Sequence, residues 1–308
     1  MEYAIITEDL TKKFGNFTAV DHLSLQIKKG EIFGFLGPNG AGKSTVIRML
    51  CGILEPSEGS GKVLGYDLKK ETEMIKKNIG YMSQKFSLYD DLTVRENLRF
   101  YAGLYSVPRK EITGRINEMI EMADLFGREN ELAANLSGGW KQRLALGCAI
   151  IAKPSIVFLD EPTSGVSPTS RRMFFKIIRE MVNEGTTVMV TTHFMDEAER
   201  CNRLAFISNG KLMAVDSPDK LKKDIIKGCM LELEISKAMD RIKEIENFPY
   251  VKECTIHGAL LHVLLESDEH KEEFEKTLQK ETKIIIPSLE DVFVSLARSF
   301  RGKLGEKE

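Results

Sequence analysis

The sequence predicts an α/β fold followed by a smaller α+β domain, and three observations support this. Up to about residue 216, short apolar runs of strand type alternate with segments of helical periodicity. A glycine-rich turn at 37–42 joins one apolar run to a helical segment. Beyond Ser217-Pro218 the alternation restarts in the order β-α-β-β-α-β. We therefore expect one domain over residues 1–217 and a second over 218–308.

The first domain is predicted from the alternation of its apolar runs. Strands are expected at 3–9, 23–28, 32–36, 79–82, 156–159, 187–191, 204–208 and 211–215, and helices at 43–53, 93–106, 111–124, 139–152, 169–183 and 195–202. Asn209-Gly210 lies between the last two apolar runs and is a strong hairpin signal. Residues 93–152 carry helical patterns without a strand signal, which predicts a helical subdomain inserted into the sheet domain.

The second domain begins with a lysine-rich segment that predicts a short helix near 220–227. Strands are then expected at 231–235, 251–256, 259–265 and 283–286, with helices at 239–245 and 269–280. This order matches a split ferredoxin-like unit. A final helix is predicted to start at Ser288, an N-cap with Asp291 three residues on. Its apolar stripe needs a partner surface, either the domain's own sheet or a second subunit, and consists of Leu289, Val292, Phe293, Leu296 and Phe300.

Composition excludes several classes of protein. The 308 residues are 42% hydrophobic and 29% charged, which argues against global disorder, and the net charge of −2 argues against a basic nucleic-acid-binding arm. The longest apolar run, 144–152, is about half of the ~18 residues that a membrane-spanning helix needs, and the N-terminus lacks a secretory signal pattern. The five cysteines are dispersed without a CxxC, which predicts reduced thiols in a cytosolic protein. Any action at a membrane is therefore expected to go through a partner.

The glycine-rich turn is a phosphate-binding P-loop in its required setting. It reads Gly37-Pro38-Asn39-Gly40-Ala41-Gly42-Lys43-Ser44-Thr45, after an apolar strand and before a helix. Glycines let the backbone N–H groups face a phosphate chain at the positive end of a helix. Lys43 supplies a charge for the outer phosphates, and the Ser44 hydroxyl is a hard oxygen ligand for Mg²⁺.

The apolar strand 156–159 ends in two carboxylates, Asp160 and Glu161. Alone, this pattern is an ordinary strand end that reaches solvent. Beside a P-loop, it predicts that Asp160 holds Mg²⁺ through water and that Glu161 orients or deprotonates the attacking water.

A third motif, Leu136-Ser137-Gly138-Gly139-Trp140, opens a helix just before that strand. Over residues 1–217 the chain thus resembles the ABC-type ATPase domain, whose signature peptide reads LSGGQ. The resemblance implies that ATP and Mg²⁺ are bound between two such subunits, homodimeric or heterodimeric, with each ATP between the P-loop of one and the signature peptide of the other. The nucleotide-binding residues it implies are Phe14, Gly37, Asn39, Gly40, Gly42, Lys43, Ser44, Thr45, Ser137, Gly138, Gly139 and Trp140.

The resemblance also assigns three isolated residues. Phe14 sits where the family places an aromatic ring on adenine. Gln84 matches the loop glutamine that touches Mg²⁺ and couples the site to the helical subdomain, and His193 matches the histidine that contacts the γ-phosphate. With Lys43 and Glu161, Gln84 and His193 form the expected catalytic set, and Ser44, Gln84 and Asp160 form the expected metal set.

Two positions depart from the family pattern. Ser167 replaces the aspartate of the usual SGLDP loop, and Trp140 replaces the glutamine of the signature. Trp140 keeps a donor N–H but loses an amide carbonyl and adds bulk. The expected catalytic residues are all present, so we expect hydrolysis to survive at a reduced rate.

The stretch Pro287-Ser288-Leu289-Glu290-Asp291-Val292-Phe293 resembles the C-terminal domain of bacterial ABC-2-type exporter ATPases. This subtype implies an ATPase subunit that powers export through a separate membrane-spanning permease, held peripherally at the cytoplasmic side of the membrane, with no nucleic acid partner. Two alternatives remain at this point: a nucleotide-dependent switch with little hydrolysis, and a soluble ABC ATPase outside transport. The cargo is not encoded in these motifs.

Overall fold

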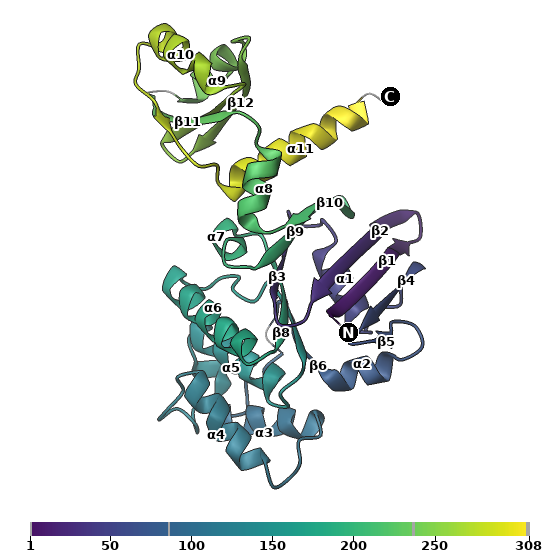
Figure 1. Ribbon diagram of the computed structural model, residues 1–308. Helices are drawn as coiled ribbons and strands as arrows, with labels where there is room; N and C mark the ends of the chain where they lie inside the picture. The colour runs from purple at the N-terminus through teal and green to yellow at the C-terminus, as the bar shows by residue number, and fades with distance from the viewer. Residues whose placement is uncertain (1, 86, 236–237, 306–308) are drawn as a thin grey trace. The chain divides into compact units, whose positions relative to one another are not determined.

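A computed structural model describes residues 2–85, 87–235 and 238–305, with side chains described up to residue 298 except at 238. The chain forms two compact units, residues 1–215 and 216–308. Figure 1 labels the helices and strands of both.

The first unit contains β1 to β10 and α1 to α7. Their bounds are β1 Tyr3–Phe14, β2 Phe17–Lys28, β3 Ile32–Leu36, α1 Lys43–Leu50, β4 Glu58–Val63, β5 Tyr66–Asp67, α2 Thr72–Asn78, β6 Ile79–Met82, α3 Val94–Leu104, α4 Ile112–Met122, α5 Gly138–Ile150, β7 Ile156–Asp160, α6 Pro168–Asn183, β8 Thr187–Thr192, α7 Met195–Ala198, β9 Arg203–Ser208 and β10 Lys211–Asp216.

The central sheet has the strand order β10-β9-β3-β8-β7-β6, and β9, β3, β8, β7 and β6 run parallel. Strands β3, β7 and β8 are buried on both faces, so alternate residues enter different cores. Val157 of β7 packs into a core with the helical segments, whereas Phe158 packs into a core with α1 and the second sheet, β2-β1-β4-β5. The sheet is therefore the middle layer of the unit (Figure 1).

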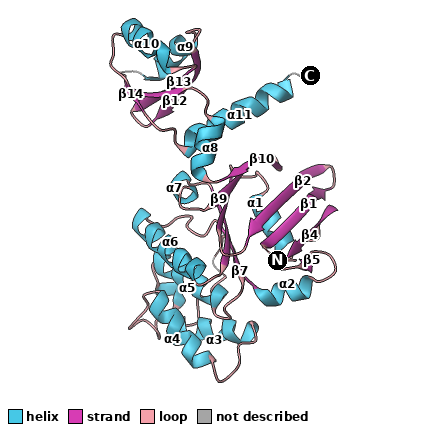
Figure 2. Cartoon of the chain, in the orientation of Figure 1, coloured by secondary structure: helices cyan, strands magenta, loops and turns pink. Residues whose placement is uncertain are grey.

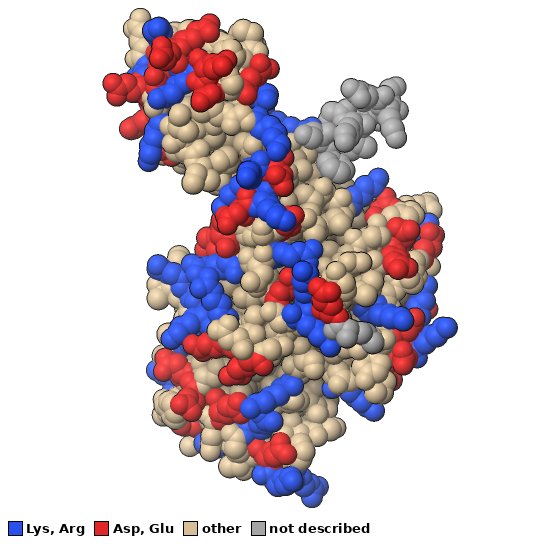
Figure 3. All heavy atoms as spheres, viewed as in Figure 1, with Lys and Arg blue, Asp and Glu red and all other residues tan. Residues whose placement is uncertain are grey.

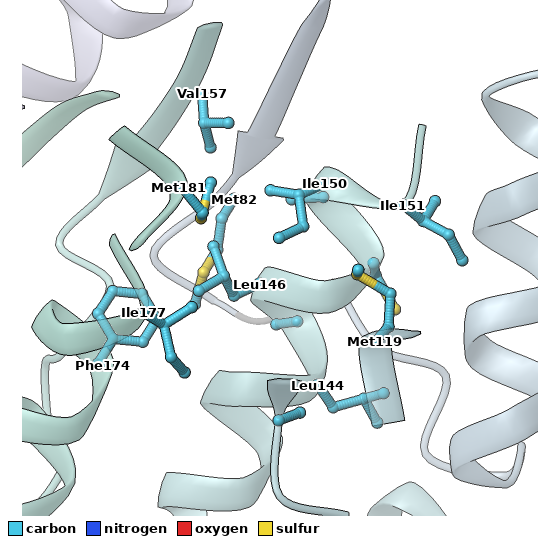
Figure 4. Close-up of a cluster of buried hydrophobic side chains, with 14 of the residues drawn as sticks. Met82, Met119, Leu144, Leu146, Ile150, Ile151, Val157, Phe174, Ile177 and Met181 are labelled. Carbon is cyan, nitrogen blue, oxygen red and sulfur yellow. The ribbon is translucent and has the colours of Figure 1, made fainter. Parts of the chain in front are cut away.

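Helices α5 and α6 pack on one side of this sheet, and α3 and α4 pack on α5. Helices α3, α4 and α5 confirm the helical segments predicted between 93 and 152. Thr93 and Glu96 form a capping box that starts α3. Figure 4 shows α5 side chains packed against β7, β6 and α6, with Leu144, Leu146, Ile150, Val157, Met82, Ile177 and Met181 labelled.

Among the described strands and α-helices, the sequence patterns did not predict β4, β5 and α2. The β4 sequence, EGSGKV, has no apolar alternation, and it becomes a strand by pairing antiparallel with β1. The predicted helix at 195–202 is wrong in length, because α7 ends at Ala198. Strands β1 and β2 are longer than predicted because they form one twelve-residue hairpin pair around Gly15.

The second unit contains α8 Pro218–Ile225, β11 Cys229–Glu234, α9 Ala238–Glu246, β12 Val251–His257, β13 Leu260–Leu265, α10 Lys271–Leu278, β14 Lys283–Ile284 and α11 Leu289–Gly305. Its sheet has the order β12-β13-β11-β14 and is antiparallel. Alternate residues such as Leu231 and Val263 join Ile245 of α9 and Phe274 of α10 in one core, so these two helices cover one face (Figure 2). The ferredoxin-like class of this unit stays a prediction, and the predicted strand 283–286 is shortened to two residues.

Helix α11 begins with the expected cap. The Ser288 hydroxyl accepts a hydrogen bond from the Asp291 N–H at 3.2 Å, and the Asp291 carboxylate accepts one from the Ser288 N–H at 2.7 Å. Leu289 and Val292 are fully buried, and Asp291 contacts histidines of β12 and β13. The beginning of α11 therefore packs on the unit's own sheet. The side chain of Phe300 lies outside the described residues.

None of the described helices combines the length and apolar character that crossing a bilayer requires. On the face drawn in Figure 3, acidic and basic side chains are interspersed in small groups over the first unit.

Candidate active site

The predicted site residues follow neighbouring strands of the central sheet. The P-loop follows β3, and His193 follows β8. Asp160 is the last residue of β7 and Glu161 comes directly after it, while Gln84 follows β6. These strands are parallel, so their carboxyl ends lie at one edge, where open α/β sheets bind ligands. The sheet order thus gathers residues that are far apart in the sequence.

Two glycines of the P-loop are required by close backbone contacts. A Cβ built on Gly37 would lie 2.3 Å from the carbonyl oxygen of Ile207, and one on Gly42 would lie 2.5 Å from that of Ala19. Gly42 also has φ 102°, a value that L side chains rarely adopt. A larger residue at either position would displace the loop before α1.

Lys43 is almost fully buried beneath this loop. Its ammonium donates to the carbonyl oxygens of Gly37 at 2.8 Å and Pro38 at 3.1 Å. Lys43 Nζ also lies 3.1 Å from Glu161 Oε1, and the two side chains are 4% and 9% exposed. A buried charge needs such partners, because water is excluded from it. The Lys43 charge is thereby fixed beside the loop.

Ser44 and Asp160 bring an oxygen pair together at the start of α1. The Ser44 hydroxyl donates to Asp160 Oδ1 at 2.9 Å, and the Thr191 hydroxyl donates to the same oxygen at 2.8 Å. Thr191 Oγ1 in turn accepts from the Glu161 N–H at 2.8 Å. Thr191, which the sequence analysis did not select, therefore orients both carboxylate residues.

Glu161 is the centre of the site. Gln84 Nε2 donates to Glu161 Oε2 at 3.1 Å, and His193 Nδ1 lies 3.5 Å from the same oxygen. Among the described residues the buried His193 Nδ1 finds no hydrogen-bond partner. Three of the predicted catalytic residues thus surround the carboxylate of the fourth.

The Glu161 backbone is strained, with φ at 45°. A residue with a long side chain rarely occupies this region, which costs on the order of 1–3 kcal/mol. The conformation turns the chain away from the buried strand β7 at Glu161, so the side chain reaches Lys43 and Gln84 instead of continuing the alternation of the strand.

A cavity of about 430 Å³ lies over the P-loop. It is lined by Phe14, Phe17, Ala19, Asn39, Gly40, Gly42, Lys43, Ser44, Thr45, Gln84 and Glu161. Phe14 is 50% exposed, and the Lys12 ammonium lies 5.2 Å from its ring centroid. Phe17, which the sequence analysis did not select, is 64% exposed and adds a second aromatic ring to this wall.

The signature peptide does not line this cavity. Ser137 and Gly138 are exposed at the beginning of α5, and the Ser137 side chain makes no capping hydrogen bond. Trp140 is half-buried, with the Arg128 guanidinium 3.6 Å from its ring centroid. Within the described part of the chain, its buried Nε1 has no acceptor. A single copy of the chain therefore does not bring these residues to the P-loop.

Ser167 is the N-cap of α6. Its hydroxyl oxygen accepts from the Ser170 N–H at 3.3 Å, ahead of Pro168 in the first turn. Gly139 lies nearby, since a Cβ built on it would be 2.7 Å from Ser170 Oγ. The departure from aspartate thus keeps the capping role, and the cap lies beside the signature peptide.

A buried carboxylate beside the site was missed by the sequence analysis. Glu197 of α7 is fully buried and accepts hydrogen bonds from the hydroxyls of Thr163 and Thr192, with Arg171 Nε 3.2 Å away. Burial raises the pKa of this carboxyl. The cluster ties α6, the loop after β7 and the end of β8 together. No sequence pattern indicated this cluster, because a glutamate in a charged segment predicts an exposed side chain.

A P-loop, a strand-terminal carboxylate pair and a loop glutamine at one edge of a parallel sheet define a P-loop nucleoside triphosphatase. Similarity to known proteins shows to which family of P-loop nucleoside triphosphatases the chain belongs. A sequence profile of the ABC transporter family matches residues 20–164. The linearmycin resistance ATP-binding protein LnrL of Bacillus subtilis is 32% identical over 300 residues, which cover 94% of this chain and 96% of LnrL. The chain belongs to the ABC transporter family of ATP-binding proteins.

Two further similarities differ in extent. The probable multidrug ABC transporter ATP-binding protein YbhF of Escherichia coli is 51% identical over 221 residues, 72% of this chain but 38% of YbhF. This chain therefore spans well under half the length of that relative. The dimeric structure of a post-hydrolysis state of the ATP-binding cassette MJ0796, bound to ADP and Pi, superposes with a TM-score of 0.63 at 26% identity, covering 69% of this chain and 98% of that one.

Proposed function

We propose that the chain is the ATP-binding and ATP-hydrolysing subunit of an exporter, which powers a separate membrane permease through ATP-driven closure of a dimer. The observation that carries this proposal is the position of Glu161, whose carboxylate lies within 3.5 Å of Lys43, Gln84 and His193 beside the P-loop. In this proposal residues 1–217 are the ATP-binding domain, with a helical subdomain at about 93–152, and residues 218–308 are an accessory domain.

The residues over the P-loop suit a nucleoside triphosphate. A glycine loop that excludes side chains leaves its N–H groups for phosphate oxygens, and Lys43 adds a fixed positive charge. Phe14 offers an exposed aromatic face to a base at the rim of the cavity. Glu161 is the residue that would accept a proton from the attacking water. Within the part of the chain that the structure describes, His193 Nδ1 makes no hydrogen bond, so it is the group that would meet a terminal phosphate.

The oxygen donors beside the loop suit Mg²⁺. Ser44 and Asp160 place a hydroxyl and a carboxylate 2.9 Å apart, and Gln84 adds an amide group nearby. Such hard oxygen ligands, few in number, are typical of protein sites that hold Mg²⁺ with nucleotide phosphates. When bound, Mg²⁺ would offset the negative charge of the phosphates. The role of Thr191 is to hold Asp160 in position.

The dimer is supported by the exposed signature peptide. Ser137, Gly138 and the first N–H groups of α5 form an uncovered helix N-terminus outside the cavity of their own chain. A second copy or a related subunit would bring this surface to the P-loop, and the dimeric MJ0796 structure supports that arrangement. Closure is then a population shift driven by ATP binding.

The permease and the site of action are inferred from the relatives. LnrL is described as a linearmycin resistance ATP-binding protein and YbhF as a multidrug ABC transporter ATP-binding protein. By analogy the chain would act peripherally at the cytoplasmic side of the membrane, held by the permease, on a cargo that the permease selects.

The variant Glu161→Gln tests the catalytic part of this proposal. Glutamine keeps the size of the side chain but cannot accept the proton, and loss of a positioned base costs about 10²–10⁴ in rate. We expect single-turnover hydrolysis of Mg-ATP to fall by that factor while ATP binding persists. Because ATP is then trapped, the variant should form a dimer on size-exclusion chromatography.

Glu180→Gln is the matched control, since Glu180 is exposed in α6, and it should hydrolyse ATP like the parent. Parental hydrolysis in Glu161→Gln would show that Glu161 is not the base. Negligible single-turnover hydrolysis by the parent itself would instead favour the nucleotide switch. Copurification of a polytopic membrane protein with the tagged chain tests the transport part independently.

A further inference from the structure

We propose a divalent transition-metal site of the Zn²⁺ type in the second unit, formed by His257, His262 and Asp291. One ligand atom from each of these side chains lies within 4.8 Å of the other two. This site is separate from the proposed function, since none of its residues belongs to the P-loop unit.

The three residues come from different elements of one layer. His257 ends β12, His262 lies in β13, and Asp291 is in the first turn of α11. His262 pairs across the ladder with Thr255, two residues before His257, so both imidazoles project from the same sheet face. The opposite face holds the apolar core with α9 and α10. The histidines therefore lie on the sheet face on which α11 begins.

The donor atoms already converge. His257 Nε2 lies 3.0 Å and His262 Nδ1 lies 2.9 Å from Asp291 Oδ1. Metal bonds of about 2.0–2.2 Å in a tetrahedral site separate neighbouring donor atoms by roughly 3.3 Å. Entry of the ion therefore widens the two nitrogen–oxygen separations by only a few tenths of an ångström, and the nearly parallel imidazole rings, at 12° to each other, turn so that each nitrogen faces the ion. His262 and Asp291 are buried at 7% and 2% exposure, which holds the donors in place.

In each ring the outer nitrogen, which is the one that does not face Asp291, lies near a further carboxylate. Glu290 Oε2 lies 3.5 Å from His257 Nδ1, and Glu232 Oε2 lies 3.6 Å from His262 Nε2. In metal sites a ligating histidine usually donates its other N–H to such a carboxylate, which fixes the tautomer and the ring. Asp291 is oriented too, because its Oδ2 accepts from the Ser288 N–H and hydroxyl, both at 2.7 Å.

Charge favours a divalent cation over a purely hydrogen-bonded cluster. Each imidazole has a carboxylate at both nitrogens, but a neutral imidazole carries one N–H. Without a cation, two N–H protons therefore serve four contacts between imidazole nitrogens and carboxylates. A single M²⁺ on the inner nitrogens offsets the negative charge of Asp291 and leaves both outer N–H groups for Glu290 and Glu232.

The donor set selects the metal class. Two imidazole nitrogens and one carboxylate suit Zn²⁺, Co²⁺ or Ni²⁺, whereas Mg²⁺ and Ca²⁺ prefer oxygen ligands throughout. Water can complete the coordination, since Glu290 is 56% exposed and His257 14% exposed. The bound ion would fasten the beginning of α11 to the β12–β13 hairpin.

The test is Co²⁺ titration of the full chain, prepared without a histidine tag and followed by visible absorption. We expect one Co²⁺ per chain with the d–d bands of four- or five-coordinate N/O ligation and no thiolate charge-transfer band. Zn²⁺ should displace it and raise the melting temperature, and Mg²⁺ should do neither. His257→Asn and Asp291→Asn should abolish the bands, and Glu232→Gln should weaken binding about 10–100-fold.

Two controls locate the metal. Asp160→Asn removes the carboxylate beside the P-loop and His22→Asn removes an exposed histidine, and both variants should keep the Co²⁺ bands. The proposal is overturned if the parent shows no bands and no Zn²⁺-dependent rise in melting temperature, if folded His257→Asn and Asp291→Asn keep the bands, or if Asp160→Asn loses them. Circular dichroism establishes that each variant is folded, and the partly exposed His257 provides a test that does not depend on the buried His262.

Discussion

Substitution of Ser167 gives a graded prediction, because the structure assigns this residue two separable environments. Its hydroxyl caps α6 through a 3.3 Å bond from the Ser170 N–H, and the cap lies beside Gly139 of the signature peptide. Ser167→Ala removes the cap, at a cost of about 0.5–2 kcal/mol. The long bond puts the expected cost at the low end of that range.

Ser167→Asp should act in the opposite direction. A carboxylate keeps the capping acceptor and places a negative charge at the helix N-terminus, which stabilises by about 0.3–1 kcal/mol. The stabilities of the two variants should therefore differ by about 0.8–1.5 kcal/mol. For a unit of this size 1 kcal/mol corresponds to about 2–4 °C in melting temperature, so the two melting temperatures should differ by about 2–6 °C, with aspartate highest and alanine lowest.

The assay separates the cap from the proposed interface. Melting without nucleotide reports the cap alone, whereas the ATP-dependent dimer fraction in a Glu161→Gln background reports the interface. If residue 167 also contributes across the dimer, aspartate should tighten the dimer several-fold, because a charge-assisted hydrogen bond exceeds a neutral one by on the order of 1 kcal/mol, and parental turnover should rise modestly. A lower melting temperature for Ser167→Asp would refute the cap. If Ser167→Asp leaves the dimer fraction unchanged or abolishes ATPase activity, residue 167 does not contribute to the interface as proposed.

Two further predictions concern buried charges. Lys43→Ala should weaken ATP binding at least about 10-fold, because a charged hydrogen bond is worth about 1.5–3 kcal/mol. Titration calorimetry that gives Lys43→Ala the same ATP affinity as the exposed control Lys176→Ala would contradict this. Burial raises the pKa of Glu197, so the protonated form stabilises the folded state below the unfolded pKa, about 4.3, and this contribution is lost as pH rises through the folded pKa. In Glu197→Gln, the free energy of unfolding measured with urea should therefore change less with pH over this range than in the parent. An equal change with pH in parent and variant would contradict this.

The class of the first unit could be predicted from the sequence, because its chemistry resides in contiguous motifs. The P-loop needs a strand, a glycine turn, Lys43 and a helix in immediate succession, so nine residues carry both the local structure and the phosphate chemistry. Most helices and strands followed from apolar periodicity, which records which face of each element is buried.

Other elements were decided by tertiary pairing. β4 carries no apolar alternation and becomes a strand because β1 offers its free edge. Gln84 and His193 are unremarkable in their local sequence, and they meet at Glu161 only because β6, β7 and β8 are neighbours in a parallel sheet. Resemblance to a family supplied these two residues in advance, whereas spacing alone could not, since long-range adjacency is a property of strand order.

Two clusters became visible only in three dimensions. Glu197 lies in a charged segment, yet it is fully buried because Thr163, Thr192 and Arg171 supply donors from three other segments. His257, His262 and Asp291 are separated by up to 34 residues in the sequence. The His257–His262 spacing lacks the cysteine pair that accompanies it in zinc motifs, yet a hairpin and a helix N-terminus bring the three donor atoms together. Local sequence sets periodicity and loop chemistry, whereas the burial of a polar group depends on which distant segments hold its partners, and only the folded chain decides that.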